Sequence, residues 1–180
     1  MAANKQALRE FQSRLAQRLQ SAQTAGVVAS WLAVESGQRA LLFPLSHAGE
    51  IFPWAGVWHV PHAQPWFLGV ANLRGGLFGV VDLAEFLSAG DKTSPSLRTE
   101  SDLAQCRLVV FNPLLEAGGA LLIDRLMGLR TPDTFTRSEA PASDAPDYYG
   151  YAYIDAQGRR WQEINLQRLS GNPAFLGIGG

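Results

Sequence analysis

Side chains able to break or form bonds are few in this sequence and poorly placed for it. His59 and His62 have a spacing that suits two metal ligands, but no cysteine or further histidine lies nearby in sequence to complete a site. His47 lies close to Glu50, a pairing that is equally common on ordinary surfaces. Cys106 begins the apolar run CRLVVFN and has the character of a small buried side chain. We therefore expect no metal site and no catalytic residue.

Motifs that bind cofactors or activate nucleophiles are missing as well. The sequence has no Gly-x-Ser-x-Gly elbow, no Walker loop and no His-Glu-x-x-His pair. The GIGG at residues 177–180 lacks the strand-then-helix context that a dinucleotide site requires. No cofactor is predicted.

One charged side chain has an unusual setting. Residues 69–83, GVANLRGGLFGVVDL, form an apolar hairpin whose tip carries Arg74, followed by Gly75 and Gly76. The two glycines are expected to take positive φ and to leave space around the guanidinium. Arg74 is then either a solvated turn residue or a recognition group, because a guanidinium can bind a carboxylate through two donors.

Aromatic residues gather just before this hairpin. Trp54, Trp58 and Trp66 fall within one uncharged segment. Aromatic side chains fill the interiors of small barrels, and tryptophan is also enriched where proteins bind one another. Because a small barrel cannot easily bury all five tryptophans of the chain, we expect at least one of these three to be exposed.

Composition narrows the function classes. The 180 residues are 47% hydrophobic and only 17% charged, which predicts surface that a partner covers. The net charge is −1, so nucleic acid is not expected as the main ligand. The single cysteine is consistent with a reducing compartment.

The N-terminus and the longest uncharged stretch bear on membrane contact. Residues 1–20 are charged throughout and have no apolar core of a signal peptide. Residues 51–73 carry no charge, but Pro53, Pro61 and Pro65 argue against a spanning helix. We expect a cytoplasmic protein without direct membrane insertion.

Elements of the expected fold follow from the period of the apolar residues. Leu8, Phe11, Leu15 and Leu19 form one stripe, which predicts an amphipathic helix over residues 5–22, within an N-terminal unit 1–24. This helix docks either on its own domain or on a partner. From residue 27 the period becomes strand-like, with short runs separated by turn residues. Residues 46–52 are expected as a loop or helical turn, 57–60 as a strand, and 131–147 as a loose segment.

The strands predict an all-β fold of two small five-stranded barrel lobes packed together. A polar linker over residues 88–101 separates them, so the first lobe is expected at about 27–90 and the second at about 104–165. A short C-terminal helix is expected at about 165–170, before Gly171.

The hairpin resembles the signature of CheW-like coupling proteins, in which a G-V-x-N-x-R-G stretch precedes an apolar strand and a D-L pair. SHAGEI at 46–51 resembles the family's turn before the third strand, and LLIDRLMGL at 121–129 resembles a later strand pair. The likeness covers most of residues 27–169, and a CheW-like domain is expected over 25–180. The extension LREFQSRLAQRL and the ending WQEINLQRLSGNPAFL resemble members from type IV pilus chemosensory systems.

This resemblance implies a protein without catalysis, cofactor or metal. Its implied partners are the regulatory domain of a CheA-like histidine kinase and the cytoplasmic tip of a methyl-accepting chemoreceptor, in arrays recruited to the membrane. Its implied output is pilus-driven twitching motility. The residues expected to bind partners are Gly69, Asn72, Arg74, Gly75, Glu50, Ala48 and Leu129.

Three alternatives remain from the sequence. The chain could be a CheW of flagellar chemotaxis, which genomic neighbours would distinguish. It could be a small hydrolase using His47 or Cys106, although neither has a neighbouring glycine motif for an oxyanion. It could be a small β-barrel module that binds a peptide or stacks single-stranded nucleic acid on its tryptophans.

Overall fold

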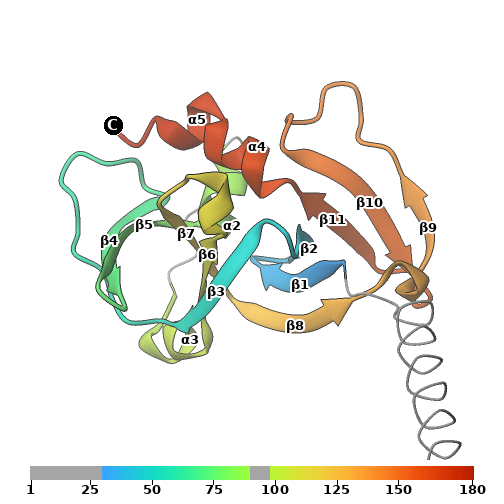
Figure 1. The fold of residues 1–180 in the computed structure, drawn as a ribbon, viewed down its shortest axis with the longest axis horizontal. Helices are drawn as coiled ribbons and strands as arrows, with labels where there is room; N and C mark the ends of the chain where they lie inside the picture. The colour runs from blue at the N-terminus through green and yellow to red at the C-terminus, as the bar shows by residue number, and fades with distance from the viewer. Residues whose placement is uncertain (1–29, 90–97) are drawn as a thin grey trace, which may run out of the picture.

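The computed structural model describes residues 30–89 and 98–180, which form two β-sheets packed against each other (Figure 1). The helix predicted over residues 5–22 lies outside the described residues, as does most of the predicted linker.

One lobe is a five-stranded sheet in the order β3-β6-β7-β5-β4. Its strands are β3 (Ala48–Pro53), β4 (Phe67–Leu73), β5 (Gly76–Asp82), β6 (Arg107–Phe111) and β7 (Gly119–Ile123). The edge strands β3 and β4 come together, because Trp58, beyond the end of β3, pairs with Val70 on β4. The sheet therefore curls on itself like a small barrel.

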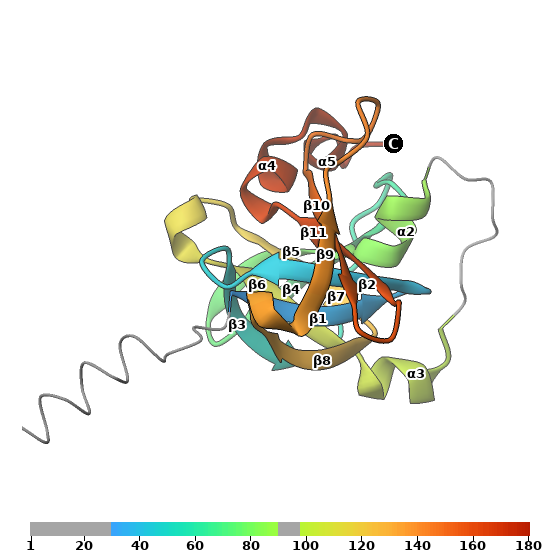
Figure 2. The ribbon, with the colours of Figure 1, turned by 90° about the vertical axis from the view of Figure 1, so that its right-hand side faces the viewer.

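The other lobe is a six-stranded sheet in the order β8-β1-β2-β11-β10-β9. Its strands are β1 (Trp31–Ser36), β2 (Arg39–Pro44), β8 (Arg125–Arg130), β9 (Phe135–Glu139), β10 (Tyr149–Asp155) and β11 (Arg160–Ile164). Strand β2 joins the rest through a parallel pairing with β11, and β1 pairs antiparallel with β8. Figures 1 and 2 show the hairpin β1–β2, from the start of the fold, between strands from its end.

The all-β fold of two packed lobes is confirmed, but some strands belong to a different lobe from the one predicted. The predicted boundaries, 27–90 and 104–165, would place β1 and β2 with β3 to β5, whereas they join the later strands. Strands β6 and β7, which fall within the predicted second lobe, in turn join β3 to β5, and the other sheet has six strands rather than the predicted five. The local sequence pattern predicts a hairpin. It does not predict which distant strand pairs with the outer edge of that hairpin.

Three apolar clusters bury side chains on the faces of the two sheets. The inward face of the five-stranded sheet packs around Leu108, Val80 and Leu122, and the six-stranded sheet has its own cluster around Trp31, Leu42 and Trp161. The opposite faces meet between the lobes in the largest cluster, which includes Leu32, Val34, Phe43, Val109, Phe111, Leu121, Ile123 and Ile164. Burial of Val80, Leu83 and Leu122, expected from the strand patterns, is confirmed.

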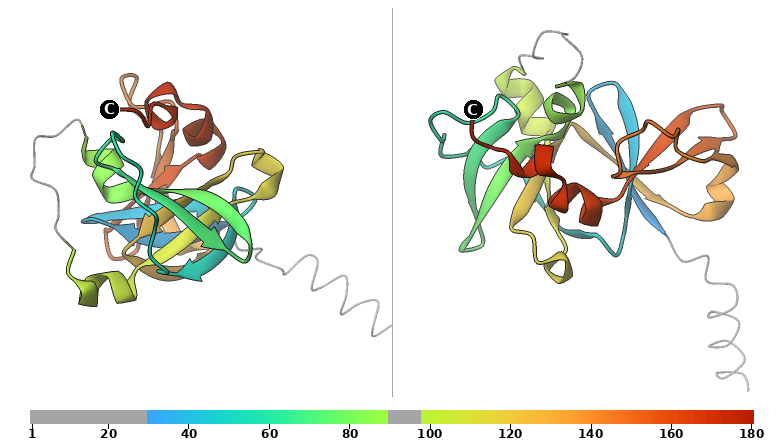
Figure 3. Two further views of the ribbon diagram at one scale, coloured as in Figure 1. Left: turned by 90° about the vertical axis from the view of Figure 1, so that its left-hand side faces the viewer. Right: turned by 90° about the horizontal axis from the view of Figure 1, so that it is seen from above.

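Short helices begin where a polar side chain caps the end of a strand or loop. Asp82 caps α2 (Leu83–Ser88), and Thr99 with Asp102 forms a capping box on α3 (Glu100–Gln105). Asn165 and Asn172 cap α4 (Leu166–Gly171) and α5 (Pro173–Leu176), so the predicted C-terminal helix is present, one residue later than expected. Figure 3 shows α4 and α5 crossing from one lobe toward the other. Two 3₁₀ turns, η1 (Pro113–Leu115) and η2 (Pro132–Thr134), complete the elements.

Three local predictions were wrong. Residues 48–53 form β3 rather than a loop, and only Trp58 of the expected strand 57–60 pairs. The segment 131–147, expected to be loose, contains β9, which pairs with β10 at the edge of its sheet. Strand β9 is almost fully exposed, so it has no apolar alternation from which a strand could be recognised.

Candidate functional site

The hairpin tip is a two-residue turn in which Arg74 itself takes the left-handed conformation. Leu73 pairs with Gly76, and the two residues between them have φ of 49° at Arg74 and 85° at Gly75. Positive φ at both positions is the pattern of a type I′ turn, which matches the twist of the strands. The Gly75 backbone N–H donates to Asn72 Oδ1 at 2.8 Å. The expectation of positive φ at Gly76 was wrong, because the arginine takes that conformation instead.

Arg74 is engaged within the chain rather than only solvated. Its Nη1 lies 2.8 Å from Oε1 of Glu50 on β3, and its guanidinium carbon lies 5.5 Å from the centre of the Phe52 ring. Both side chains stay open to solvent, with Arg74 75% and Glu50 58% exposed. The contact joins the end of β4 to the opposite edge strand and leaves the guanidinium accessible to a partner.

Gly69 has a structural task in the fold. Its φ is 134°, and a Cβ built there would lie 2.2 Å from the carbonyl oxygen of Trp58. The neighbouring Val70 exchanges two backbone hydrogen bonds with Trp58, of 2.8 and 2.9 Å. Only glycine allows the backbone of Trp58 to approach β4 this closely.

The consequence is an exposed tryptophan on a fixed backbone. Trp58 is 64% exposed, whereas Trp66 is buried in the core between the lobes and Trp54 is half-buried. The prediction that at least one tryptophan of this segment is exposed is confirmed. Leu77, 68% exposed, pairs with Asn72 on the same outward side of the hairpin as Val70. We call Trp58 and Leu77 the Trp58 face.

A second apolar surface lies where the two lobes meet. Leu129 and Leu126 on β8 pair with Leu32 and Val34, which belong to the core between the lobes. On β3, Ala48 and Ile51 pair with Phe111 and Val109 of the same core. Since cross-strand partners share a face, these four side chains continue the inter-lobe core at its edge. We call them the inter-sheet patch.

The inter-sheet patch is open to solvent. Leu129 is 56% exposed, and Leu126 and Ile51 are each 39% exposed. Strands β3 and β8 are edge strands of their sheets, and they lie next to each other in two views (Figures 1 and 2). The patch therefore joins surface from both lobes without a covering element among the described residues.

The predicted site residues divide between these surfaces. Asn72, Arg74, Gly75 and Glu50 meet at the tip of the hairpin, and Gly69 supports Trp58. Ala48 and Leu129 belong to the inter-sheet patch. Sequence reasoning missed Ile51 and Leu126. Leu126 and Leu129 are three residues apart, which breaks strand alternation, and only the bulge opposite Ala33 and Val34 returns them to one face.

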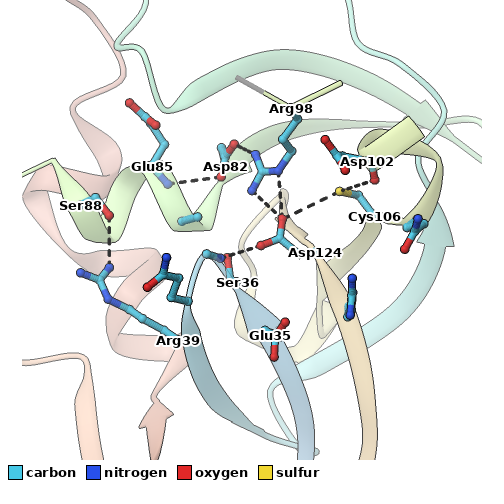
Figure 4. A pocket seen from close by; sticks show the side chains of 15 residues that line it. Glu35, Ser36, Arg39, Asp82, Glu85, Ser88, Arg98, Asp102, Cys106 and Asp124 are labelled. Atoms are coloured by element: carbon cyan, nitrogen blue, oxygen red, sulfur yellow. Dashed lines mark hydrogen bonds and ion pairs between the residues drawn. The ribbon is translucent and has the colours of Figure 1, made fainter. Parts of the chain in front are cut away.

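A polar cavity of about 720 Å³ lies on a different part of the surface (Figure 4). Arg98 lies between Asp82, at the end of β5, and Asp124, at the end of β7. Asp124 also accepts the backbone N–H of Gly37, in the β1–β2 turn, at 2.6 Å. This network links the two sheets and uses Asp82 and Asp124, two aspartates of the family-like motifs.

Neither candidate nucleophile or base has a catalytic setting. Burial raises the pKa of the Cys106 thiol, whose sulfur contacts the backbone oxygen of Asp102 at 3.3 Å. Burial lowers the pKa of His47. Within residues 30–89 and 98–180, no three potential metal ligands gather at one place. No helix in those same ranges is long and apolar enough to cross a membrane.

Comparison with known proteins gives three findings. Residues 30–173 match the family model of the CheW-like domain. The chain is 31% identical over 169 residues to Protein PilI of Pseudomonas aeruginosa, covering 92% of this chain and 88% of that protein. The crystal structure of the scaffolding protein TtCheW from Thermoanaerobacter tengcongensis superimposes with a TM-score of 0.56, covering 74% of this chain and 86% of that one at 12% identity. At that identity the structural likeness shows the fold.

Proposed function

The chain belongs to the CheW-like domain family, and from that premise we propose that it is an adaptor without catalytic activity that couples a chemoreceptor to a CheA-like histidine kinase. Two separate exposed apolar surfaces, the Trp58 face and the inter-sheet patch, are the observation that carries this proposal. An adaptor needs two surfaces that can be occupied at once, whereas an enzyme needs convergent reactive groups.

The inter-sheet patch is the proposed contact for the chemoreceptor tip. A helix presents apolar side chains at spacings of three and four residues, and such a stripe can cover a narrow apolar strip on two adjoining edge strands. Arg125 and Arg130 pair with Glu35 and Trp31 on β1, so they lie on the face of β8 opposite Leu126 and Leu129. The patch itself is therefore apolar, and it favours a helix with an uninterrupted apolar stripe.

The end of the five-stranded lobe is the proposed contact for the kinase regulatory domain. It presents the Trp58 face, and the hairpin tip carries the accessible Arg74 guanidinium. A large exposed tryptophan with a fixed backbone is typical of the residues that dominate binding energy.

The proposed output is type IV pilus twitching motility, in cytoplasmic arrays beside the membrane. The 31% identity to Protein PilI over most of both chains supports this assignment, and it is the reason to prefer it to flagellar chemotaxis. Deleting the encoding gene should abolish twitching zones on agar and leave flagellar swimming unchanged. Loss of swimming with normal twitching would favour the flagellar alternative.

Binding experiments with matched variants test the two surfaces. Leu129→Asp should abolish binding of a chemoreceptor signalling fragment and leave binding of the kinase regulatory domain intact, because a charge replaces an apolar contact only at the patch. Leu114→Asp, on η1 and 85% exposed, is the control and should bind both partners normally. Unchanged receptor binding by Leu129→Asp, measured by calorimetry, would contradict the proposed receptor contact.

A further inference from the structure

The described chain begins beside the inter-sheet patch. The Ser30 backbone N–H donates to the carbonyl oxygen of Arg130 at 2.9 Å, and its own carbonyl accepts from Leu45 at 3.0 Å. Arg130 directly follows Leu129 on β8. The first described residue, Ser30, therefore lies next to one end of the patch.

The length and pattern of the preceding residues suit this position. The stripe from Leu8 to Leu19 would extend about 17 Å as a helix, whereas Leu126 and Leu129 are separated by about 10 Å of extended strand. The ten residues between Leu19 and Ser30 can span up to about 33 Å, so the stripe can turn back to reach the patch.

We propose that residues 5–22 dock through this stripe onto the inter-sheet patch of the same chain. Burial of Leu8, Phe11, Leu15 and Leu19 against Ile51, Leu126 and Leu129 would remove both apolar surfaces from water. The tether provides an effective concentration on the order of mM, so even a weak contact would be well populated.

The charges of the segment are compatible with this orientation. Arg9 and Arg14 would lie away from the stripe of the predicted helix, and Arg125 and Arg130 lie on the face of β8 opposite the patch, because they pair with Glu35 and Trp31. Docking through the stripe therefore does not bring these arginines together. A chemoreceptor helix that binds the same patch would compete with the docked segment. This competition rests on the proposed function, whereas the docking itself does not.

A thiol-reactivity experiment on the full-length chain tests the docking. Leu129→Cys places an accessible thiol in the patch, and the unsubstituted chain is the blank because Cys106 is buried. Reaction with a maleimide dye is compared in this background with and without Leu15→Asp, which disrupts the stripe. The matched control is Gln17→Asp, which adds the same charge on the opposite side of the predicted helix.

We expect Leu15→Asp to speed labelling of the thiol about tenfold, the change for a segment docked about nine-tenths of the time, and Gln17→Asp to leave the rate unchanged. Equal rates in all three proteins would overturn the proposal, as would protection that disappears on dilution, which indicates docking between two copies. Leu126→Cys serves as the second probe if Leu129→Cys alters the thermal unfolding curve.

Leu15→Asp and Gln17→Asp, made also in the chain that keeps Leu129 and compared with the unsubstituted chain for receptor binding, separate this proposal from the proposed function. If Leu15→Asp exposes the thiol but no variant binds a chemoreceptor fragment, the docking stands and the receptor assignment fails. If the fragment binds all variants equally and the thiol is never protected, the docking fails and the receptor assignment stands.

Discussion

At the scale of single residues, Arg74 forms a surface ion pair with Glu50, and most of its side chain is exposed to solvent. Sequence reasoning left two interpretations, a solvated turn residue or a recognition group, and the contact with Glu50 was not foreseen. The contact depends on the curl of a whole sheet, which brings residues 24 positions apart in sequence to 2.8 Å. A pattern within one hairpin cannot contain that information.

Charge reversal at this pair separates stability from binding. Arg74→Glu places two carboxylates together, but exposed pairs contribute only about 0–1 kcal/mol, so the free energy of unfolding should fall by no more than about 1 kcal/mol. The double variant Arg74→Glu with Glu50→Arg should recover that loss in urea unfolding. Kinase binding should stay weakened by about 2 kcal/mol in both proteins, because the guanidinium is no longer on the hairpin tip. Binding restored by the double variant would mean that Arg74 acts only through Glu50.

At Gly69, even the addition of one methyl group should lower the free energy of unfolding strongly. Gly69→Ala would place a methyl group 2.2 Å from the Trp58 carbonyl oxygen on a backbone with φ of 134°. We expect the free energy of unfolding to fall by about 2–4 kcal/mol, through strain and loss of the Trp58–Val70 pairing. Gly118→Ala is the control, because its Cβ would meet no atom within 4 Å and its φ is not positive. Equal urea midpoints for the two variants would show that Trp58 can move away without penalty.

At the scale of elements, the hairpins and the capped C-terminal helix were predictable because their signals are local. The strands β4 and β5 alternate apolar residues around a two-residue turn, and Asn165 marks the start of α4. Strand β9 and the allocation of β1 and β2 were not predictable, since the former is exposed and the latter depends on distant partners. The inter-sheet patch was predicted only through Ala48 and Leu129, and the bulge that aligns Leu126 with Leu129 required the structure.

Trp58, in the exposed segment that pairs with β4, gives a prediction at the scale of elements. Trp58→Ala should leave the melting temperature nearly unchanged, since the side chain is 64% exposed and its backbone pairing does not need it. Affinity for the kinase regulatory domain should fall by about 2 kcal/mol or more, as for other tryptophans that dominate interfaces. Loss of the acrylamide-quenchable part of the fluorescence would verify that the correct tryptophan was removed. Wild-type affinity with normal folding would exclude the Trp58 face from the kinase contact.

At the scale of the whole molecule, the two lobes are parts of one folding unit. The chain passes from the six-stranded sheet to the five-stranded sheet after β2 and returns at β8. The largest apolar cluster takes residues from both sheets, so neither sheet can bury its inter-lobe face alone. The surfaces proposed for the two partners are therefore held in a fixed relation, as an adaptor requires.

The network around Arg98 fixes that relation on the polar side of the molecule, and its removal is the test. The Arg98 side chain is 12% exposed between Asp82 and Asp124, which are 9% and 26% exposed. Arg98→Met would leave two carboxylates close together and poorly solvated. This should lower the free energy of unfolding by about 3 kcal/mol and the melting temperature by about 6–12 °C. Arg98→Lys should recover only part of the loss, because an ammonium group cannot match the several directed donors of a guanidinium.

Arg137→Met, at an ion pair whose arginine is 68% exposed, is the control and should melt like the unsubstituted chain. If Arg98→Met melts like that control, the apolar core alone holds the two sheets together. The binding of receptor and kinase should then be equally unaffected.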